Sequence, residues 1–494
     1  MVINPLFLEL TENFLLHYSK DFTPHYCSHK CVKYAEKYFS QLPRTMNPYL
    51  KPIACQWTIL ETIRIKKAND VRVKNIRAIL IYRAPCGRKL SNEAQVDNYL
   101  HETQSRLSIE LFVFDSLVNI KQSYCSDGKL INSDISNGQE NVPISAVNEV
   151  DDEQPSSTFT YRVERTPVEG VDMVINDPTM TCCSCTDGCR NRIQCACWLR
   201  TLKYAELIGD DRVKAMKKKH KSQAEILYQL GYGFRRLYKN APGGIYECNS
   251  RCSCNKDTCS NRVVQNGIIA QLQLFKTVGR GWGVRTLHDL PLGTFISVYS
   301  GEIFTSEQAD ERGKLIGDEY QADLDFFENI NDDSDEDEEG GTNLESDEED
   351  DENKVPSTNT ETMNTRTRNL RSRETSNKKT TKKPPKVTLE ETNNNSMLNR
   401  TLLPEYDGVV YTLDAKLIGN IGRYFNHSCS PNIAVQNVFV DTHDIHFPWI
   451  GFFTTKTIRA GTELCWDYNY TVGEIAGRRM DCNCGSSECR RRVL

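Results

Sequence analysis

The spacing of the cysteines constrains this chain more than any other feature of its sequence. The chain has 20 cysteines among 494 residues, and nine of them form two runs, Cys183-x-Cys185-x3-Cys189-x5-Cys195-x-Cys197 and Cys248-x3-Cys252-x-Cys254-x4-Cys259. Cys-x-Cys pairs are poorly spaced for loop-closing disulfides. The first 20 residues are also untypical of a secretory signal, because Glu9 and Glu12 interrupt their apolar stretch. We therefore expect metal-binding thiolates in an intracellular protein.

The number of thiolates indicates the kind of metal cluster. Tetrahedral zinc takes four ligands, so two ions would use eight of the nine cysteines and leave one over. Three ions offer twelve positions, which nine thiolates fill if three of them bridge two ions each. The sequence therefore predicts a structural three-zinc cluster without an open coordination position. Its negative charge calls for nearby basic residues, and the candidates are Arg190, Arg192, Arg251 and Arg262. Cys182 breaks the spacing and is expected not to be a ligand.

A third cysteine group, Cys482-x-Cys484-x4-Cys489, lies near the carboxyl end. It offers three ligands and needs a fourth, for which Cys429 in the sequence Asn-His-Ser-Cys is the best candidate. A fourth zinc ion would then tie the tail to the loop that contains Cys429.

The amino-terminal residues contain what resembles half of a further metal site. Cys27 and Cys31 lie near His25 and His29 in a segment that is expected to be mostly helical. The other half of such a site is not evident from the sequence, and Cys55 is only a weak candidate. Ordinary thiols and surface imidazoles are the preferred interpretation.

Residues 50–125 are predicted to form a small α+β module. Alternating apolar and polar residues in WTILETIRI and VKNIRAILIYR predict two strands, and SNEAQVDNYLHET predicts a helix with Ser91 as N-cap. The run YRAPCGRKLSNEAQVDNYL resembles methyl-CpG-binding domains. Members that read DNA carry an arginine where this chain has Ser91, and serine cannot contact guanine O6 and N7 together. The resemblance therefore favours a structural or protein-binding role, with phosphate contacts from Arg88 and Lys89, over recognition of methylated DNA.

Two strand-rich segments, 265–327 and 404–470, flank an insertion at about 328–403. Residues 332–352 hold 14 acidic residues, and without them 61 basic residues stand against 53 acidic ones. A basic stretch follows the acidic block, and such blocked charge predicts disorder. The basic stretch suits a nuclear localisation signal or attraction to the acidic block; a merely solvated loop is the alternative. A long loop costs little closure entropy, so the flanking segments can still form one fold. No apolar run reaches the ~18–20 residues that span a bilayer.

Four short motifs occur in the strand-rich segments: Gly279-Arg-Gly-Trp-Gly283, Tyr299-Ser-Gly-Glu302, Arg423-Tyr-Phe-Asn-His-Ser-Cys429 and Glu463-Leu-Cys-Trp-Asp-Tyr468. Together with the cysteine groups they resemble SET-domain protein lysine methyltransferases with pre-SET and post-SET modules. The insertion and the methyl-CpG-binding-like module narrow the resemblance to the bifurcated-SET, eggless-type histone H3 lysine-9 methyltransferases, over roughly residues 20–494.

This resemblance implies an α+β fold class. We expect a mostly β SET fold interrupted by a disordered insertion, preceded by a three-zinc, nine-cysteine pre-SET module and a small α+β methyl-CpG-binding-like domain. The expected parts are an N-terminal segment (1–49), the methyl-CpG-binding-like domain (50–125), the pre-SET module (142–263), the SET domain (264–470) and the post-SET motif (478–494).

The chemistry of lysine methylation agrees with these residue types. A lysine near its usual pKa of about 10.4 costs roughly 4.6 kcal/mol to deprotonate at pH 7. An apolar aromatic channel lowers this cost, because it desolvates the ammonium group. Alignment of donor and acceptor contributes about 7–11 kcal/mol more. Such a site needs aromatic walls, one oriented hydroxyl and a clamp for the cofactor, but no strong base.

The resemblance also assigns roles to single residues. Tyr468 would supply the catalytic hydroxyl, with Tyr320 near the methyl-transfer pore. Trp466 lacks the hydroxyl that restricts methylation number, which favours di- or trimethylation. The residues implied to bind S-adenosylmethionine are Arg280, Gly281, Trp282, Asp318, Tyr320, Tyr411, Arg423, Asn426 and His427. The alternatives are core aromatics for Tyr468 and Trp466, a turn residue for Asn426 and a purely structural imidazole for His427.

The implied function is methylation of lysine 9 in the histone H3 tail on chromatin, in the nucleus and on the chromosome, giving heterochromatin formation and transcriptional repression. The peptide would add a strand to a sheet edge, with Asp323 and Asp325 either attracting a basic tail or merely solvated. Alternatives are a non-catalytic chromatin-binding scaffold and an enzyme for a non-histone lysine. Activating or repressor-complex proteins are not identified by the sequence.

Overall fold

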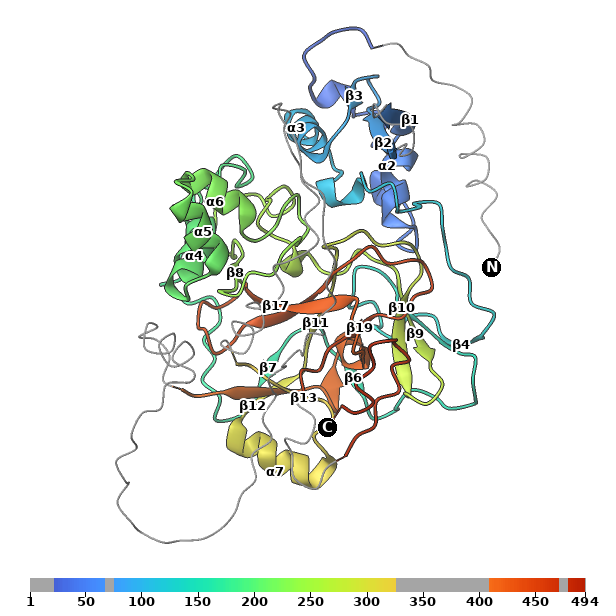
Figure 1. The fold of residues 1–494 in the computed structure, drawn as a ribbon, viewed down its shortest axis with the longest axis vertical. Coiled ribbons are helices and arrows are strands. Elements are labelled where there is room, and N and C mark those ends of the chain that lie inside the picture. Colours follow the sequence, from blue (N-terminus) through green and yellow to red (C-terminus); the bar gives the residue numbers. More distant parts are fainter. Residues whose placement is uncertain (1–21, 67–74, 326–407, 471–478, 494) are drawn as a thin grey trace, which may run out of the picture.

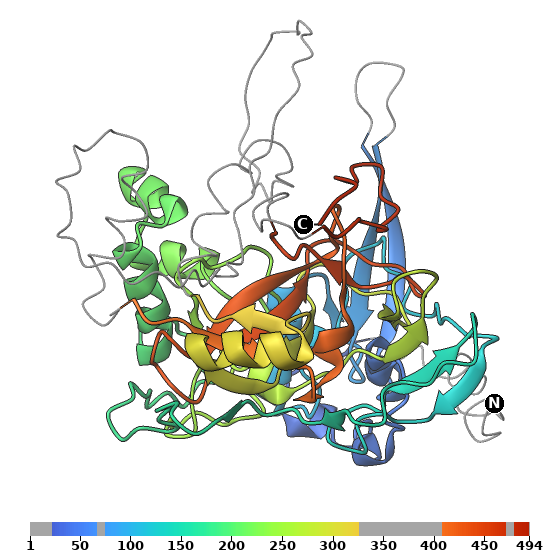
Figure 2. The same cartoon turned by 90° about the horizontal axis from the view of Figure 1, so that it is seen from below.

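The computed structural model describes residues 22–66, 75–325, 408–470 and 479–493. Helices and strands are mixed throughout (Figures 1 and 2), which confirms the expected α+β class. The predicted disordered insertion at about 328–403 lies outside the described residues. Among the helices that the structure describes, none is both long and apolar enough to cross a membrane.

A small module at the N-terminal end contains a three-stranded antiparallel sheet of order β1-β2-β3. Its core joins Trp57 to Tyr99 and Phe112, with ring centroids 5.3 and 4.8 Å apart. Both predicted strands and the predicted helix are present. The elements are η1 (His29–Cys31), η2 (Phe39–Gln41), η3 (Pro48–Leu50), α2 (Lys51–Ala54), β1 (Thr58–Lys66), β2 (Asn75–Arg83), β3 (Lys89–Leu90), α3 (Glu93–Thr103) and η4 (Ile109–Leu111).

Two local expectations for this module were wrong. Residues 1–45 were expected to be mostly helical, but the described part of this segment, residues 22–45, contains only the short 3₁₀ helices η1 and η2. The N-cap of α3 is Asn92, whose side chain accepts the N–H of Gln95, rather than Ser91. Ser91 instead donates its backbone N–H to Gln95 Oε1 at 2.9 Å. Both residues therefore contribute to the start of the helix, but only Asn92 accepts the orphan N–H.

Three helices stand beside the cysteine-rich arms (green in Figure 1). They are α4 (Ala196–Leu207), α5 (Asp211–Lys218) and α6 (Gln223–Gln229). Helix α6 begins with a capping box, in which Ser222 and Glu225 satisfy each other's backbone N–H groups. The helices and the cysteines share one buried cluster that also includes Trp198, Leu227 and Phe453. The cysteine-rich arms are therefore packed directly against the strand-rich half.

Of five short strands that precede the catalytic motifs, all but the first pair with strands of the C-terminal half, and the first pairs antiparallel with the second. These strands are β4 (Lys129–Asn132), β5 (Ser145–Asn148), β6 (Thr160–Tyr161), β7 (Thr166–Pro167) and β8 (Ile245–Tyr246). Strands β5, β6, β7 and β8 run parallel to β9, β15, β12 and β17, respectively. Such two- to four-residue strands carry little periodic signal, and the sequence did not predict them.

The strand-rich half consists of small sheets with the orders β10-β9-β5-β4, β11-β18-β17-β8, β13-β14-β12-β7, β15-β6 and β16-β19. Its elements are η5 (Val264–Asn266), β9 (Leu272–Lys276), β10 (Trp282–Thr286), β11 (Phe295–Tyr299), β12 (Glu302–Thr305), α7 (Ser306–Ile316), β13 (Gln321–Asp323), β14 (Tyr411–Asp414), β15 (Ile418–Gly419), η7 (Ile421–Tyr424), β16 (Asn426–His427), β17 (Ile433–Phe439), β18 (Trp449–Thr454) and β19 (Cys465–Trp466).

Strand β14 joins the two segments that the insertion separates. Leu413 lies opposite Ile303 of β12 on one side and Ala322 of β13 on the other. All three side chains belong to the main buried cluster. The expectation of one fold split in sequence is therefore confirmed, and it brings residues before and after the insertion to the same site.

Candidate active site and metal centres

The two cysteine runs meet in one buried cluster. Three groups of four thiols each have all their sulfurs within 4.8 Å of one another: Cys183/Cys195/Cys197/Cys248, Cys183/Cys189/Cys248/Cys254 and Cys183/Cys185/Cys189/Cys195. Cys183 belongs to all three groups. Its sulfur lies 3.6 Å from Cys189 Sγ and 3.7 Å from Cys248 Sγ, close to the ~3.8 Å edge of a tetrahedron with Zn–S bonds of about 2.3 Å. Shared thiols at this spacing are what bridging between ions requires.

The two remaining cysteines of the runs border these groups. Cys252 Sγ lies 3.6 Å from Cys197 Sγ. Cys259 is fully buried, and its sulfur accepts the N–H of Asn261 at 3.4 Å. Cys182 is exposed and belongs to none of the groups found among the described residues.

The expected basic residues have different partners. Arg262 donates to Cys254 Sγ at 3.5 Å, as a counter-charge to the thiolates should. Arg192 donates to the carbonyl of Leu227 at 2.7 Å, and Arg251 to that of Asp177 at 3.2 Å. Arg190 forms an ion pair with Asp97 of α3 at 2.5 Å. Arg190 thus connects the metal arm to the N-terminal module.

Close backbone approach holds the two arms together. Ser260 donates its N–H to the carbonyl of Gly188 at 2.8 Å, and Ser253 donates to that of Cys183 at 2.9 Å. Gly188 has a φ of +69°, and a Cβ there would lie 2.9 Å from the Thr258 carbonyl oxygen. A side chain at this position would therefore separate the arms.

The C-terminal cysteines gather around Cys429, the residue that the sequence suggested as fourth ligand. The sulfurs of Cys429, Cys482, Cys484 and Cys489 all lie within 4.8 Å of one another, and Cys429 Sγ is 3.7 Å from Cys482 Sγ. Four thiols fill a tetrahedral site, so this group suits a closed structural zinc ion.

Two motifs of the catalytic half are joined by a short parallel pairing. In it, Asn426 of β16 lies opposite Cys465 of β19, and His427 lies opposite Trp466. This register places the aromatic residues that follow β19 beside the loop that carries Cys429. The C-terminal cysteine group and the aromatic site are therefore neighbours.

The aromatic site is organised around one carbonyl group. The Phe425 carbonyl accepts the Tyr468 hydroxyl at 3.0 Å and the Trp466 Nε1–H at 3.2 Å. The rings of Trp466 and Tyr468 have centroids 5.1 Å apart, and Phe452 lies 5.3 Å from Trp466. Burial raises the pKa of Tyr468 above its usual value, so the hydroxyl stays protonated at neutral pH.

A second tyrosine extends this aromatic wall. Tyr299 donates its hydroxyl to the backbone carbonyl of Tyr320 at 2.8 Å. Burial, reinforced by the neighbouring Tyr468, raises the pKa of Tyr299 well above its usual value. The sequence named Tyr299 only as part of a motif and gave it no role.

His427 supports the backbone of Tyr468. Its Nδ1 accepts the Tyr468 N–H at 3.2 Å, and its Nε2 lies 3.3 Å from Cys429 Sγ. Burial lowers the pKa of His427 to about 4, so the ring is neutral. These contacts are those of a structural imidazole, and a role of His427 in holding the cofactor stays a prediction.

Glu463 joins three of the residues that were implied to bind the cofactor. It forms an ion pair with Arg280 and accepts a hydrogen bond from Asn426 Nδ2 at 2.9 Å. Asn426 also donates to the carbonyl of Trp282 at 3.2 Å. A Cβ on Gly283 would lie 2.7 Å from Glu463 Oε1, so a side chain there would displace the carboxylate from its present position. The sequence missed this role of Glu463, although the residue opens the Glu-Leu-Cys-Trp-Asp-Tyr motif.

Arg423 contacts Tyr320, which was also implied to bind the cofactor. Its guanidinium lies 3.9 Å from the ring centroid of Tyr320 and 4.4 Å from that of Phe159. The two aromatic rings fix the position of the cation. Arg423 and Tyr320 come from opposite sides of the insertion, so the sequence could not show this contact.

The other predicted cofactor residues lie as follows. Gly281 has a φ of +66° in the turn before β10, and its carbonyl accepts the Thr277 N–H at 2.8 Å. The carbonyl of Asp318 accepts the Gln321 N–H at 3.1 Å. Tyr411 packs on Phe447, with ring centroids 4.6 Å apart.

Comparison with known proteins adds the family. Three family models match the chain: the methyl-CpG binding domain over residues 45–122, the pre-SET motif over 136–262 and the SET domain over 281–469. Among solved structures, Arabidopsis thaliana SUVH6 in complex with SAM is 29% identical, with 75% of this chain and 57% of that chain covered and a TM-score of 0.47.

Curated relatives align along almost the whole chain. Histone-lysine N-methyltransferase eggless of Drosophila melanogaster is 37% identical over 492 residues, which are 95% of this chain and 36% of that protein. The chain thus spans little more than a third of that relative's length. Histone-lysine N-methyltransferase SETDB2 of Danio rerio is 32% identical over 480 residues, 91% of this chain and 75% of that protein. The chain belongs to the eggless and SETDB family of bifurcated-SET histone-lysine N-methyltransferases.

Proposed function

We propose that this chain transfers methyl groups from S-adenosylmethionine to a lysine side chain, with lysine 9 of histone H3 as its substrate. The observation that carries the proposal is the convergence of Tyr468 and Trp466 on the Phe425 carbonyl. The curated relatives, which are named histone-lysine N-methyltransferases, support the same reaction.

The aromatic residues suit the chemistry of an uncharged amine. Removal of water from the lysine ammonium lowers its pKa, and the rings of Trp466, Tyr468 and Phe452 provide a water-poor wall. The Tyr468 hydroxyl donates its hydrogen bond to the Phe425 carbonyl. Its oxygen lone pairs therefore remain available to accept an N–H from the lysine. Tyr468 therefore orients the amine and does not act as a base.

The residues around Glu463 fit a polar, cationic cofactor. S-adenosylmethionine, when bound, supplies a methyl group on a positively charged sulfur. Among the described residues, Trp282 Nε1 and Arg423 Nε are buried donors without a hydrogen-bond partner, and both can serve polar groups of a ligand. Arg280, Trp282, Arg423 and Asn426 would hold the cofactor, with Glu463 fixing Arg280 and Asn426.

The direct test is methyl transfer by this chain to histone H3 tail peptides with radiolabelled S-adenosylmethionine. We expect label on the unmodified peptide and none on a peptide with arginine in place of lysine 9. Label on both peptides would point to another lysine. No label on any peptide or on other nuclear proteins would favour a non-catalytic scaffold.

Replacement of Glu463 tests the cofactor assignment. Glu463→Gln removes the charge that holds Arg280, and we expect the KM for S-adenosylmethionine to rise about tenfold, equivalent to roughly 1.4 kcal/mol. Glu110→Gln is the control, because Glu110 forms a comparably buried ion pair with Arg235 at 3.1 Å in another part of the fold. An unchanged KM in Glu463→Gln would contradict the assignment.

Trp466 is proposed to permit di- and trimethylation. A tyrosine at this position would add a hydroxyl that can hold a water molecule in the space for the second methyl group. We expect Trp466→Tyr to shift the product towards monomethyl-lysine, as measured by mass spectrometry of the peptide. Trp466→Phe, which adds no hydroxyl, should keep higher methylation; the same product from both variants would refute this role.

The metal centres are proposed to hold zinc, three ions in the pre-SET cluster and one in the post-SET group. The shared thiols and the closed Cys429 group support this number. Their role is structural, because the cysteines are grouped with cysteines and leave no position for a substrate.

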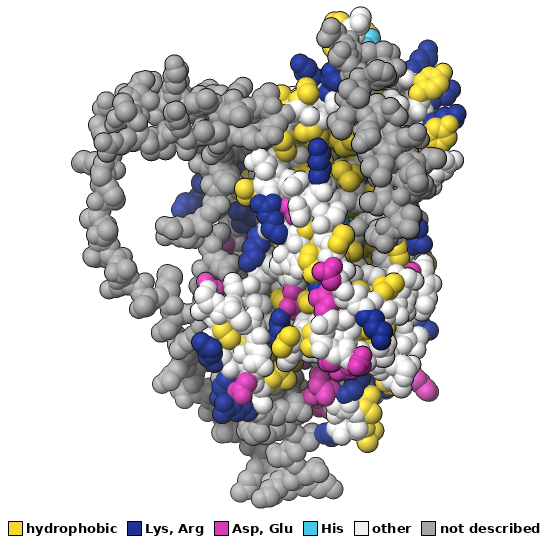
Figure 3. Space-filling view, turned by 90° about the vertical axis from the view of Figure 1, so that its right-hand side faces the viewer, with side chains coloured by type: hydrophobic (Ala, Val, Ile, Leu, Met, Phe, Trp, Pro, Cys, Tyr) yellow, Lys and Arg dark blue, Asp and Glu magenta, His cyan; other side chains and the backbone are white. Residues whose placement is uncertain are grey.

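The methyl-CpG-binding-like module is proposed to have a structural or protein-binding role. The Ser91 hydroxyl donates to Gln95 Oε1 at 3.3 Å. This contact belongs to the start of the helix and does not serve to recognise DNA bases. On the face in Figure 3, the end that this module occupies carries Lys, Arg and hydrophobic side chains, while acidic side chains lie mostly over the other half. A basic surface supports non-specific contact with phosphates.

By the same reasoning we place the protein in the nucleus, on chromosomes, where methylation of histone H3 would give heterochromatin and repress transcription. The histone tail would bind as an added strand. Asp323 already accepts the Thr412 hydroxyl at 2.7 Å, so its carboxylate is partly occupied. Activating or repressor-complex proteins remain an expectation from the family resemblance.

A further inference from the structure

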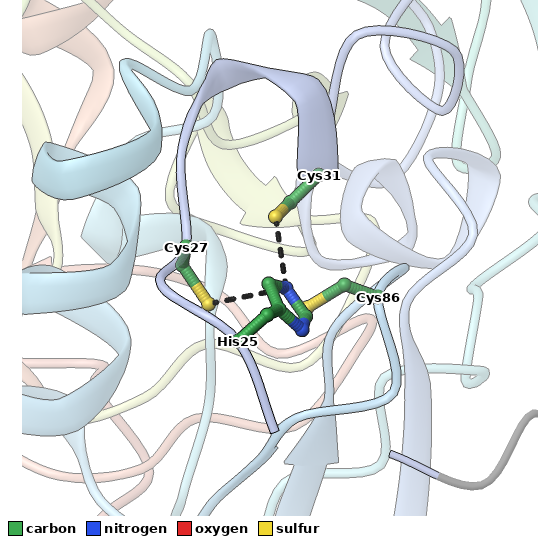
Figure 4. Close-up of side chains that lie close together, drawn as sticks. All are labelled: His25, Cys27, Cys31 and Cys86. Atoms are coloured by element: carbon green, nitrogen blue, oxygen red, sulfur yellow. Dashed lines mark hydrogen bonds between the residues drawn. The ribbon is translucent and has the colours of Figure 1, made fainter. Parts of the chain in front are cut away.

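Four potential ligands meet where the N-terminal segment contacts the methyl-CpG-binding-like module. Figure 4 shows Cys27 and Cys31 from the N-terminal segment, and Cys86 from the turn between β2 and β3, around the ring of His25. The His25 Nε2 atom is 3.3 Å from Cys31 Sγ and 3.8 Å from Cys27 Sγ. All four ligand atoms lie within 4.8 Å of one another.

We propose that these residues bind one zinc ion as a Cys3His site. Zinc with Zn–S bonds of about 2.3 Å and a Zn–N bond of about 2.0 Å has ligand atoms roughly 3.5–3.8 Å apart, close to the observed distances. The three residues between Cys27 and Cys31 are also within the usual spacing of paired zinc ligands. With four ligands the site is closed, so its role is structural.

The surroundings of the ligands favour a metal over ordinary thiols. His25 Nδ1 lies 2.7 Å from the Thr23 carbonyl, a bond that places the proton on Nδ1 and leaves the Nε2 lone pair facing the cysteines. In a metal-bound histidine, the ring nitrogen that does not bind the metal usually donates its N–H to a group such as a backbone carbonyl. Arg88 Nη1 lies 3.5 Å from Cys27 Sγ, and the Tyr99 hydroxyl lies 3.3 Å from Cys86 Sγ. Both groups can donate to thiolates.

The sequence could not complete this site, because Cys86 follows Cys31 only after 54 intervening residues. Cys55, the weak candidate, is buried in the module core beside Trp57 and is not part of the group. His29 is not part of it either. The turn Ala84-Pro85-Cys86-Gly87 brings the missing ligand next to the N-terminal segment.

A metal at this position would fasten residues 23–31 to the turn before β3. The family match for the module begins only at residue 45, so the site would extend the folded unit towards the N-terminus. It would also hold Arg88, one of the two proposed phosphate contacts, between Cys27 and Glu102.

The experiment is metal analysis of the purified chain and its variants. We expect Cys27→Ser/Cys31→Ser to contain one zinc ion fewer than the unchanged chain, and His25→Cys, which keeps four ligands, to contain the full number. Cys125→Ser is the matched control, since Cys125 is an exposed thiol outside every group of described ligands. The zinc difference does not depend on methyltransferase activity, so the two proposals can fail separately.

Two further measurements test whether these four residues bind the metal. Cobalt-substituted chain should lose part of its thiolate-to-cobalt absorption in the double variant but not in Cys125→Ser. If the double variant does not fold, Cys86→Ser, which changes the opposite side of the site, must show the same loss of one ion. An unchanged zinc content, or a disulfide found between two of these cysteines in the native chain, would overturn the proposal.

Discussion

Replacement of Cys248 by serine is expected to unfold the pre-SET region and to abolish methyl transfer. Cys248 is fully buried and belongs to two of the three thiol groups, and its sulfur lies 3.6 Å from Cys189 Sγ and 3.8 Å from Cys195 Sγ. A shared ligand supports more than one ion, so its loss should release more than one zinc per chain. Each structural zinc contributes on the order of 10 kcal/mol to folding, more than the whole stability of many domains.

The loss should spread to the catalytic half, because the cysteines share a buried cluster with Phe295, Val298 and Phe453 of strands β11 and β18. We expect a fall in melting temperature of at least about 10 °C, measured by calorimetry together with the zinc content. Cys182→Ser is the control, since this exposed thiol is adjacent in sequence but belongs to none of the described groups. If Cys248→Ser keeps its zinc and its melting temperature, the bridged-cluster assignment is wrong.

Features with a local or strictly spaced pattern were predictable from the sequence. Cysteine spacing anticipated the two-run cluster and the approach of Cys429 to the C-terminal cysteines, because ligand geometry depends on few residues. The two long strands and helix α3 followed from their periodicity. The continuity of the fold across the insertion followed from the low entropic cost of a long loop.

Features that depend on contacts between distant segments were not predictable. The pairing of β5, β6, β7 and β8 with C-terminal strands involves two or three residue pairs each. The ion pair of Arg280 with Glu463 joins residues 183 positions apart, and the contact of Arg423 with Tyr320 spans the insertion. The sequence motifs identified these residues one by one, but only the tertiary structure shows which of them are in contact.

Replacement of Tyr468 by phenylalanine is expected to lower kcat at least about 100-fold with little effect on folding. The variant keeps the ring that packs on Trp466 and removes only the hydroxyl that reaches the Phe425 carbonyl. Loss of one such hydrogen bond costs about 1 kcal/mol of stability. Loss of the group that orients the amine affects only the reacting complex, where positioning is worth several kcal/mol.

Tyr82→Phe provides the matched control for this experiment. The Tyr82 hydroxyl also donates to a backbone carbonyl, that of Val113 at 3.1 Å, and accepts the Val113 N–H at 3.0 Å, but it lies in the core of the N-terminal module. Tyr82→Phe should lose at least as much stability in urea denaturation as Tyr468→Phe, because it loses two hydrogen bonds, whereas only Tyr468→Phe should lose methyl transfer in single-turnover assays. Equal activity in the two variants would show that Tyr468 is merely a core aromatic, because a packing role depends on the ring and not on its hydroxyl.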